Sequence, residues 1–134
     1  MTESVWISQQ LGRPIFKAFN SILFHSLSAL GKHEGSPDRL AIPAAGGDAR
    51  AKQIVMGLVN EAGFDPVDGG ALEESWRQQP STPAYCCDYG AQKTQQEIRA
   101  AVKGKAAKIR DTAWREGYGR LYANKPTHAD DTLT

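Results

Sequence analysis

Small and polar residues follow three short apolar stretches of the chain, a pattern typical of ligand-binding loops. These residues are Asn20 and Ser21, residues 43–48 and residues 68–70. In open α/β sheets, ligands bind beyond the carboxyl ends of parallel strands. Small residues at that edge allow backbone amides to approach a flat ligand, although each glycine taken alone is more commonly a tight-turn residue. We therefore expect the three segments to form one ligand-binding edge.

A phosphate group has no evident binding loop at this edge. The sequence Gly46-Gly47-Asp48-Ala49 resembles the start of an anion-binding helix. However, the Asp48 carboxylate would accept hydrogen bonds from the same amides, so we predict that Asp48 caps the helix. A complete dinucleotide-binding domain carries a G-x-G-x-x-G turn after its first strand. That motif does not occur in the sequence.

Catalytic side chains and metal ligands are not evident either. No serine lies in a G-x-S-x-G turn, and Glu73 and Glu74 are placed to favour a helix dipole. The three histidines are scattered and Cys86 and Cys87 are adjacent, a spacing unlike that of metal ligands. We predict no catalytic acid or base, no metal, and two partly buried thiols, with a redox switch as the alternative.

The composition favours a single cytoplasmic domain. The chain has 134 residues and a formal net charge of +1, so no global field would draw it to nucleic acid or a membrane. The basic run at residues 103–110 is predicted to be a solvated helix face. The N-terminus lacks a signal-peptide pattern, and no apolar stretch is long enough to span a bilayer.

The best-specified element is a helix that begins after Asp48 and ends before Gly63. Its predicted apolar side has helical spacing and consists of Ala51, Ile54, Val55, Leu58, Val59 and Ala62. Apolar strands are predicted before it, at residues 40–42, and after it, ending at residues 67–70. A strand, a helix and a strand of these lengths predict a right-handed crossover in a parallel sheet.

The remaining elements complete a partial Rossmann-like α/β fold followed by C-terminal helices. We predict helices at residues 4–11, 22–30, 72–79 and 92–110, and a further strand at residues 15–19. Residues 1–89 are expected to form the sheet-containing part. Residues 90–134 are expected to form a helical extension with a polar tail.

Several motifs in order give the chain a resemblance to a known family. They are RPIFKAFN at residues 13–20, RLAIP at 39–43, KQIV at 52–55, FDPVDGG at 64–70 and ESWRQQP at 74–80. The chain resembles the NADP-dependent oxidoreductases of the deazaflavin-coenzyme (coenzyme F-420) reductase type, from about Leu11 to Tyr89. The resemblance implies hydride transfer between NADP(H) and a deazaflavin or flavin-like partner, with the cofactors supplying the chemistry.

The resemblance also implies where the two cofactors would lie. The residues it places near the nicotinamide are Ala18, Phe19, Asn20, Pro43 and Ala44. The residues it places around the hydride partner are Trp76, Gln79 and Pro80.

The chain departs from the family because the glycine-rich half that binds the pyrophosphate is missing. NADP affinity is therefore expected to be weak or absent for this chain alone, and a sheet edge and face are expected to be exposed. We expect a homo-oligomer or a complex with a complementary N-terminal half. The alternative is a non-catalytic remnant or association module.

Overall fold

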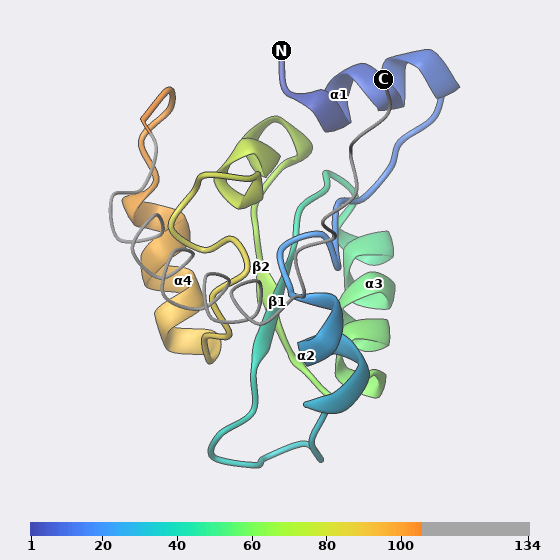
Figure 1. The fold of residues 1–134 in the computed structure, drawn as a ribbon. Helices are drawn as coiled ribbons and strands as arrows, with labels where there is room; N and C mark the ends of the chain where they lie inside the picture. Colours follow the sequence, from blue (N-terminus) through green and yellow to red (C-terminus); the bar gives the residue numbers. More distant parts are fainter. Residues whose placement is uncertain (106–134) are drawn as a thin grey trace, which may run out of the picture.

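The structure is a computed structural model that describes residues 1–105 (Figure 1). The elements in chain order are α1 (Glu3–Leu11), α2 (Phe24–Ala29), β1 (Ala41–Ala44), α3 (Ala49–Glu61), β2 (Asp65–Asp68), the 3₁₀ helix η1 (Leu72–Gln78) and α4 (Ala91–Ala100). β1 and β2 pair in parallel, with Ala41 opposite Asp65 and Ala44 opposite Asp68. The expected strand–helix–strand unit and the mixed α/β class are confirmed, with a sheet of two strands among the described residues.

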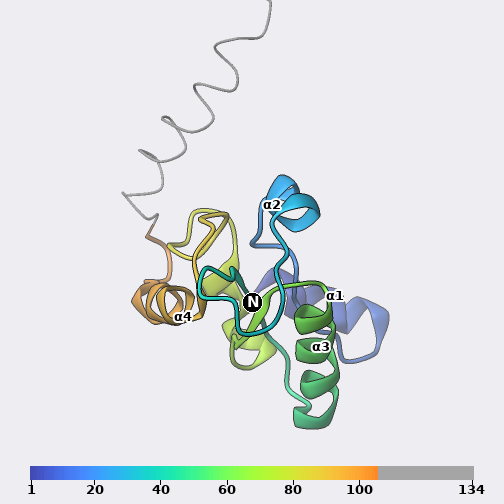
Figure 2. The same ribbon diagram turned by 90° about the horizontal axis from the view of Figure 1, so that it is seen from below.

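The strand pair lies between two helices (Figures 1 and 2). α3 packs against one face, and α4 packs against the other. The core on the α3 side consists of Ile42, Val59 and Phe64, with Phe19, Ile22 and Leu40 packed against it. The core on the α4 side consists of Val67, Ala84 and Ile98, with Ala41 and Ala91 against it. Each face of the sheet thus has a small core of its own.

Both ends of α3 form as the sequence predicts. The Asp48 side chain accepts a hydrogen bond from the Arg50 amide at 3.0 Å and therefore caps the helix. Gly63 follows the helix with φ of +104°, and a Cβ at this position would lie 2.8 Å from the Gly31 Cα. Glycine is required here by the backbone conformation and by the close approach of the chain.

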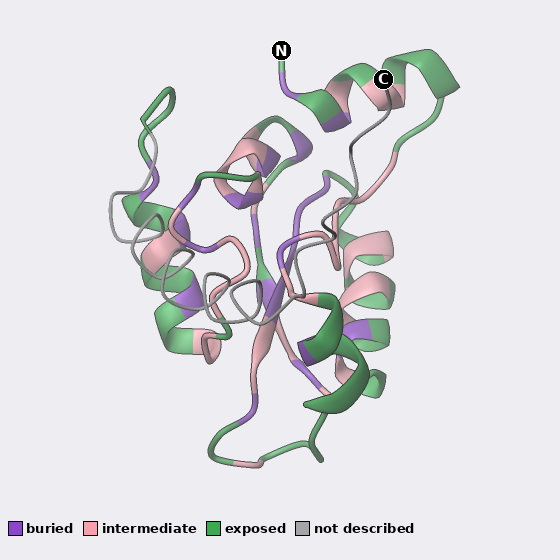
Figure 3. Ribbon diagram, in the orientation of Figure 1, coloured by how far each residue is buried: buried purple, intermediate pink, exposed green. Residues whose placement is uncertain are grey.

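The predicted apolar side of α3 is only partly buried (Figure 3). Val59 is fully buried, but Ile54 is 62% exposed and Leu58 is 53% exposed. Two strands spaced about 4.8 Å apart form a sheet only about as wide as one helix, so they contact only the side of α3 that faces them. The sheet therefore covers one flank of the apolar side and leaves the other uncovered by the described residues.

The strand expected at residues 15–19 does not form. These residues form a single antiparallel bridge, between Lys17 and Ala45, in place of a strand. The chain leaves the extended conformation at Phe19, whose φ is +63°, and so cannot continue along the sheet. The helix expected at residues 22–30 is shorter and forms α2.

The two later helices also differ from the expectation. Residues 72–78 form the 3₁₀ helix η1, whose C-cap Gln79 is extended just before Pro80. α4 ends at Ala100 because Ala101 adopts an extended conformation, with φ of −62° and ψ of 131°. Residues 106–110 of the predicted long helix lie outside the described residues. No helix within residues 1–105 has the length and apolarity needed to cross a membrane.

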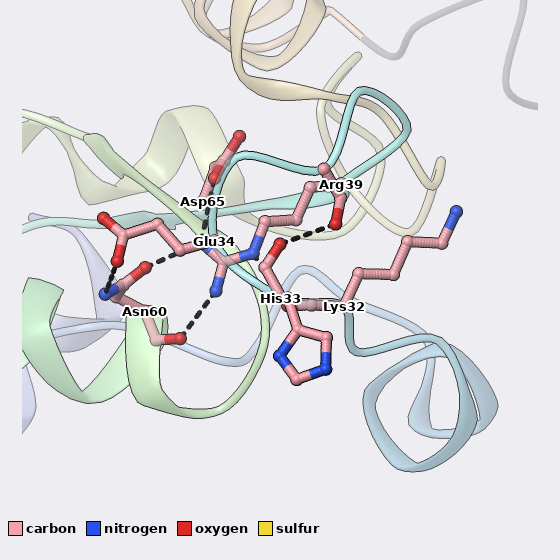
Figure 4. A network of polar contacts seen from close by, with 7 residues as sticks. Lys32, His33, Glu34, Arg39, Asn60 and Asp65 are labelled. Atoms are coloured by element: carbon pink, nitrogen blue, oxygen red, sulfur yellow. Dashed lines mark hydrogen bonds and ion pairs between the residues drawn. The ribbon is translucent and has the colours of Figure 1, made fainter.

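A buried guanidinium joins the unit at the amino ends of its strands (Figure 4). The Arg39 side chain is 2% exposed. Its Nε donates to the Lys32 carbonyl at 3.0 Å, and its Nη2 donates to the Asn60 carbonyl at 2.7 Å. Its Nη1 donates to Asn60 Oδ1 at 2.6 Å and to Asp65 Oδ1 at 3.0 Å. Arg39 thus ties the loop before β1 to the end of α3 and the start of β2.

We predict that Arg39→Met lowers the free energy of unfolding by about 3 kcal/mol, because it leaves buried acceptors and a carboxylate unpaired. The free energy of unfolding of Arg39→Lys should lie between those of Arg39→Met and the wild type, since a single ammonium group cannot donate in all the directions that the guanidinium does. Urea unfolding followed by circular dichroism measures both. Arg99→Met, at an exposed residue of α4, is the control, and an equal effect of the two methionine substitutions would contradict the role of Arg39.

Candidate functional site

The outer edge of β1, on the side away from β2, is closed by other parts of the chain. The Ala41 amide donates to the Tyr89 carbonyl at 2.9 Å. Ala45 exchanges two hydrogen bonds with Lys17, each of 2.9 Å. Pro43 has no amide to satisfy, which suits it to a strand edge. The sequence predicts an exposed sheet edge, and the outer side of β1 is not such an edge, because backbone groups from distant segments bind to it.

A pair of amide side chains closes the middle of this edge. The Asn20 Nδ2 donates to the Gln78 carbonyl at 2.7 Å, and the Gln78 Nε2 donates to Asn20 Oδ1 at 3.1 Å. The Gln78 Nε2 also contacts the carbonyls of Lys17 at 3.1 Å and Pro43 at 3.4 Å. Gln78 is 1% exposed. We call this pair the amide clasp; it joins segments 58 residues apart in the sequence.

The clasp also explains why the first residue after β2, Gly69, is a glycine. A Cβ on Gly69 would lie 2.6 Å from Gln78 Oε1 and 3.1 Å from the Ala44 carbonyl oxygen. The Gly69 amide donates to that same Ala44 oxygen at 2.7 Å. Gly69 is therefore needed for space at the carboxyl edge of the sheet.

A large open cleft lies beside the clasp, with a volume of about 920 Å³. Trp76, Gln79 and Pro80, the residues expected around the hydride partner, all line it. α1 contributes Trp6, and the segment after α4 contributes Lys103 and Lys105. Arg77 lies 4.4 Å from the centre of the Trp76 ring, and Lys103 lies 5.9 Å from it. The cleft thus combines aromatic walls with positive charge.

A smaller cleft of about 390 Å³ contains two of the residues expected near the nicotinamide. Ala18 and Asn20 line it, together with Lys17, and Glu3 and Pro80 border both clefts. Burial lowers the pKa of the Lys17 amine, and the nearby Glu3 carboxylate opposes that shift. The smaller cleft therefore offers a partly desolvated amine next to the clasp.

The other three residues expected near the nicotinamide have buried or structural positions. Phe19 packs against the core on the α3 side, and Pro43 and Ala44 are buried within β1. Only the Pro43 carbonyl reaches the edge, where Gln78 binds it. These three residues position the edge, whereas Asn20 and Ala18 line a cleft.

Sequence reasoning missed Gln78, Lys17, Trp6 and the two lysines after α4 as site residues. Gln78 lies next to the predicted Gln79, but only the tertiary structure distinguishes the buried glutamine from the partly exposed one. Trp6 and the lysines line the cleft because α1 packs on η1 and the chain returns after α4. No local spacing in the sequence indicates that α1, η1 and the segment after α4 come together.

An ion pair holds the turn after β2 against α3. The Lys52 Nζ donates to Asp68 Oδ1 at 2.8 Å and to the Gly70 carbonyl at 2.9 Å. The Gly70 amide donates to the same Asp68 oxygen at 2.8 Å. The hydrogen bond from Lys52 is the main reason that the pKa of Asp68 is lowered, and the Gly70 amide adds to it against the cost of burial. Among residues 1–105, no group of three or more His, Cys, Asp or Glu side chains is arranged to hold a metal ion.

The chain is similar to a protein of Escherichia coli (strain K12) named YjhV. The two are 45% identical over 97 residues, which are 72% of this chain and 69% of YjhV. No family model matches the chain. No solved structure matches it.

We predict that Gln78→Leu lowers the free energy of unfolding by about 2 kcal/mol, because it leaves Asn20 Oδ1 and the Lys17 carbonyl without the donor that they share. Gln79→Leu is the matched control, since the neighbouring side chain is only partly buried. Chemical denaturation of both variants measures the difference. Equal stability of the two variants would contradict the clasp.

We predict that Asp68 contributes a pH-dependent part of the stability. A lowered pKa in the fold means that this part is present above about pH 4 and is lost as the pH falls through the folded pKa. The difference in unfolding temperature between wild type and Asp68→Asn should therefore shrink in acid. Thermal unfolding between neutral and acidic pH measures it. Asp38→Asn, at a carboxylate 85% exposed, is the control, and an equal trend in both variants would contradict the role assigned to Asp68.

Proposed function

This chain belongs to the YjhV family, and we propose that it is part of an NADP-dependent oxidoreductase, because the segments that the resemblance places around a nicotinamide meet at one sheet edge. It would supply the nicotinamide side of the site for hydride transfer to a deazaflavin or flavin-like partner. When bound, NADPH supplies the hydride and the partner accepts it with one proton. The chain's own residues would orient the rings and exclude water.

The amide clasp is the observation that carries this proposal. It joins Asn20 to the Pro43 carbonyl on the outer edge of β1, and its Gln78 packs against Gly69, just past the carboxyl end of β2. The clasp therefore adjoins the carboxyl ends of the strands, beyond which open α/β sheets bind their ligands. Asn20 also lines the smaller cleft, and Trp76 lines the larger cleft next to it, with Pro80 on both. A nicotinamide against Asn20 and a flat partner against Trp76 would thus be neighbours.

The phosphate-binding part would come from a complementary N-terminal half. The helix start after β1 is capped by Asp48, and the sequence has no G-x-G-x-x-G turn. The 97 aligned residues are 69% of YjhV, so YjhV is itself about 140 residues long. About 40 residues lie outside its aligned part, whereas a half with two crossovers of roughly 30 residues or more would need about 60. YjhV itself therefore has too few residues outside its aligned part for such a half.

We predict that the chain alone binds NADPH and reduced nicotinamide mononucleotide with affinities within about tenfold of each other, because only the nicotinamide end has contacts here. Saturation-transfer NMR should show the strongest effect on nicotinamide ring protons. Asn20→Ala should reduce it, and Gln10→Ala on α1 should not. Strongest saturation on the adenine, or none with either ligand at millimolar concentration, would contradict the proposal.

A second candidate function is association without catalysis. The exposed Ile54 and Leu58 on α3 favour it, since large apolar side chains on one helix face suit a protein interface. The same titration separates the two candidates. Assembly that persists without any nucleotide binding would favour the association module.

A further inference from the structure

One face of α3 is left uncovered by the described residues and has the composition of a helix interface. It consists of Arg50, Ile54, Gly57, Leu58 and Glu61, which follow one another at spacings of three or four residues or are adjacent. Ile54 is 62% exposed and Leu58 is 53% exposed. We call this set the α3 face. Figures 1 and 3 show that α3 lies at the side of the molecule, with exposed residues along it.

No contact within the described chain requires a glycine at position 57, in the middle of this face. A Cβ added to it would meet nothing within 4 Å. Glycine inside a helix costs roughly 1 kcal/mol relative to alanine, and no contact here offsets that cost. A missing side chain at the centre of an exposed face allows a second helix to approach closely.

The charges at the two ends of the α3 face are opposite. Arg50 lies in the first turn and Glu61 is the last helical residue, with the apolar residues between them. Neither side chain forms an ion pair with the described part of the chain. An antiparallel second copy would place Arg50 against the partner's Glu61, and Ile54 against the partner's Leu58. The face is therefore complementary to itself about a two-fold axis.

We propose that two copies of this chain associate through an antiparallel pairing of α3 with α3 of the partner. The two-fold axis would cross the helix pair at the level of Met56, so each of these contacts would occur twice in the dimer. Association would bury Ile54 and Leu58 on both copies and form two Arg50–Glu61 ion pairs across the interface. One helix pair buries less than the roughly 1,600 Å² of a standard interface, so the dimer is of micromolar affinity or weaker.

This assembly does not depend on the proposed oxidoreductase function. No residue of α3 lines the larger cleft or the smaller one, so both remain open in the dimer. Nucleotide binding and self-association are therefore separate measurements. Failure of either leaves the other standing.

Analytical ultracentrifugation of the full chain, from micromolar to millimolar concentration, tests the proposal. The wild type should shift reversibly from monomer to dimer. Leu58→Glu should remain monomeric throughout, because it places a carboxylate in the apolar part of the interface. The matched control is Leu11→Glu, at a leucine 59% exposed on α1, which should associate like the wild type. Circular dichroism of both variants checks that they fold.

Charge reversal gives the sharper test. Glu61→Arg alone places like charges together twice and should raise the dissociation constant about tenfold. The double variant Arg50→Glu/Glu61→Arg restores both pairs and should return the constant to near its original value. Recovery in the double variant is an effect that local damage to α3 would not produce. A wild type that stays monomeric, or a double variant as weak as the single one, would overturn the proposal.

Discussion

Backbone hydrogen bonding along β1 is the constraint on which the rest of the structure depends. β1 is buried and has a strand neighbour on one side only, so the groups on its other side need partners from elsewhere. Lys17, Gln78 and Tyr89 supply them, and Pro43, which lies between Ala41 and Ala45, has no amide to satisfy there. These partners come from the segments before and after the crossover unit. Hydrogen bonding to the outer backbone groups of β1 therefore holds both segments at the same edge. The candidate site is a consequence of that closure.

Two polar contacts hold the crossover unit at opposite ends. At the amino ends of the strands, the buried Arg39 binds the end of α3 and the start of β2. At the carboxyl ends, Lys52 binds Asp68 and the turn that follows β2. The Arg39 side chain is 2% exposed, whereas in the second contact the Asp68 side chain is 61% exposed and that of Lys52 is 13% exposed. The carboxyl end is therefore the less costly one to rearrange around a ligand.

The two proposals use different surfaces for physical reasons. The clefts lie where segments from several parts of the chain meet, and they combine aromatic rings with amide and amine groups. The α3 face belongs to one helix, is apolar at its centre and has opposite charges at its ends. Mixed, concave surfaces suit small molecules, whereas a regular helix face suits another helix. A narrow sheet produces both, because it leaves one edge to be closed by loops and one flank of α3 uncovered.

The sequence by itself determined the local elements of this protein. The spacing around Asp48 and Gly63 predicted α3 and both of its ends, and the flanking apolar residues predicted two parallel strands, because caps and periodicity act over a few residues. The motifs also pointed to Asn20 and Trp76, which line clefts in the structure. Hydride transfer and NADP remain proposals based on a resemblance. Tertiary structure decided that Lys17 forms one bridge in place of a strand, that Gln78 is the buried glutamine, and that Ile54 is exposed. Each of these depends on which distant segment reaches β1 or covers α3, and pairing across 58 residues or more leaves no periodic signal in the chain.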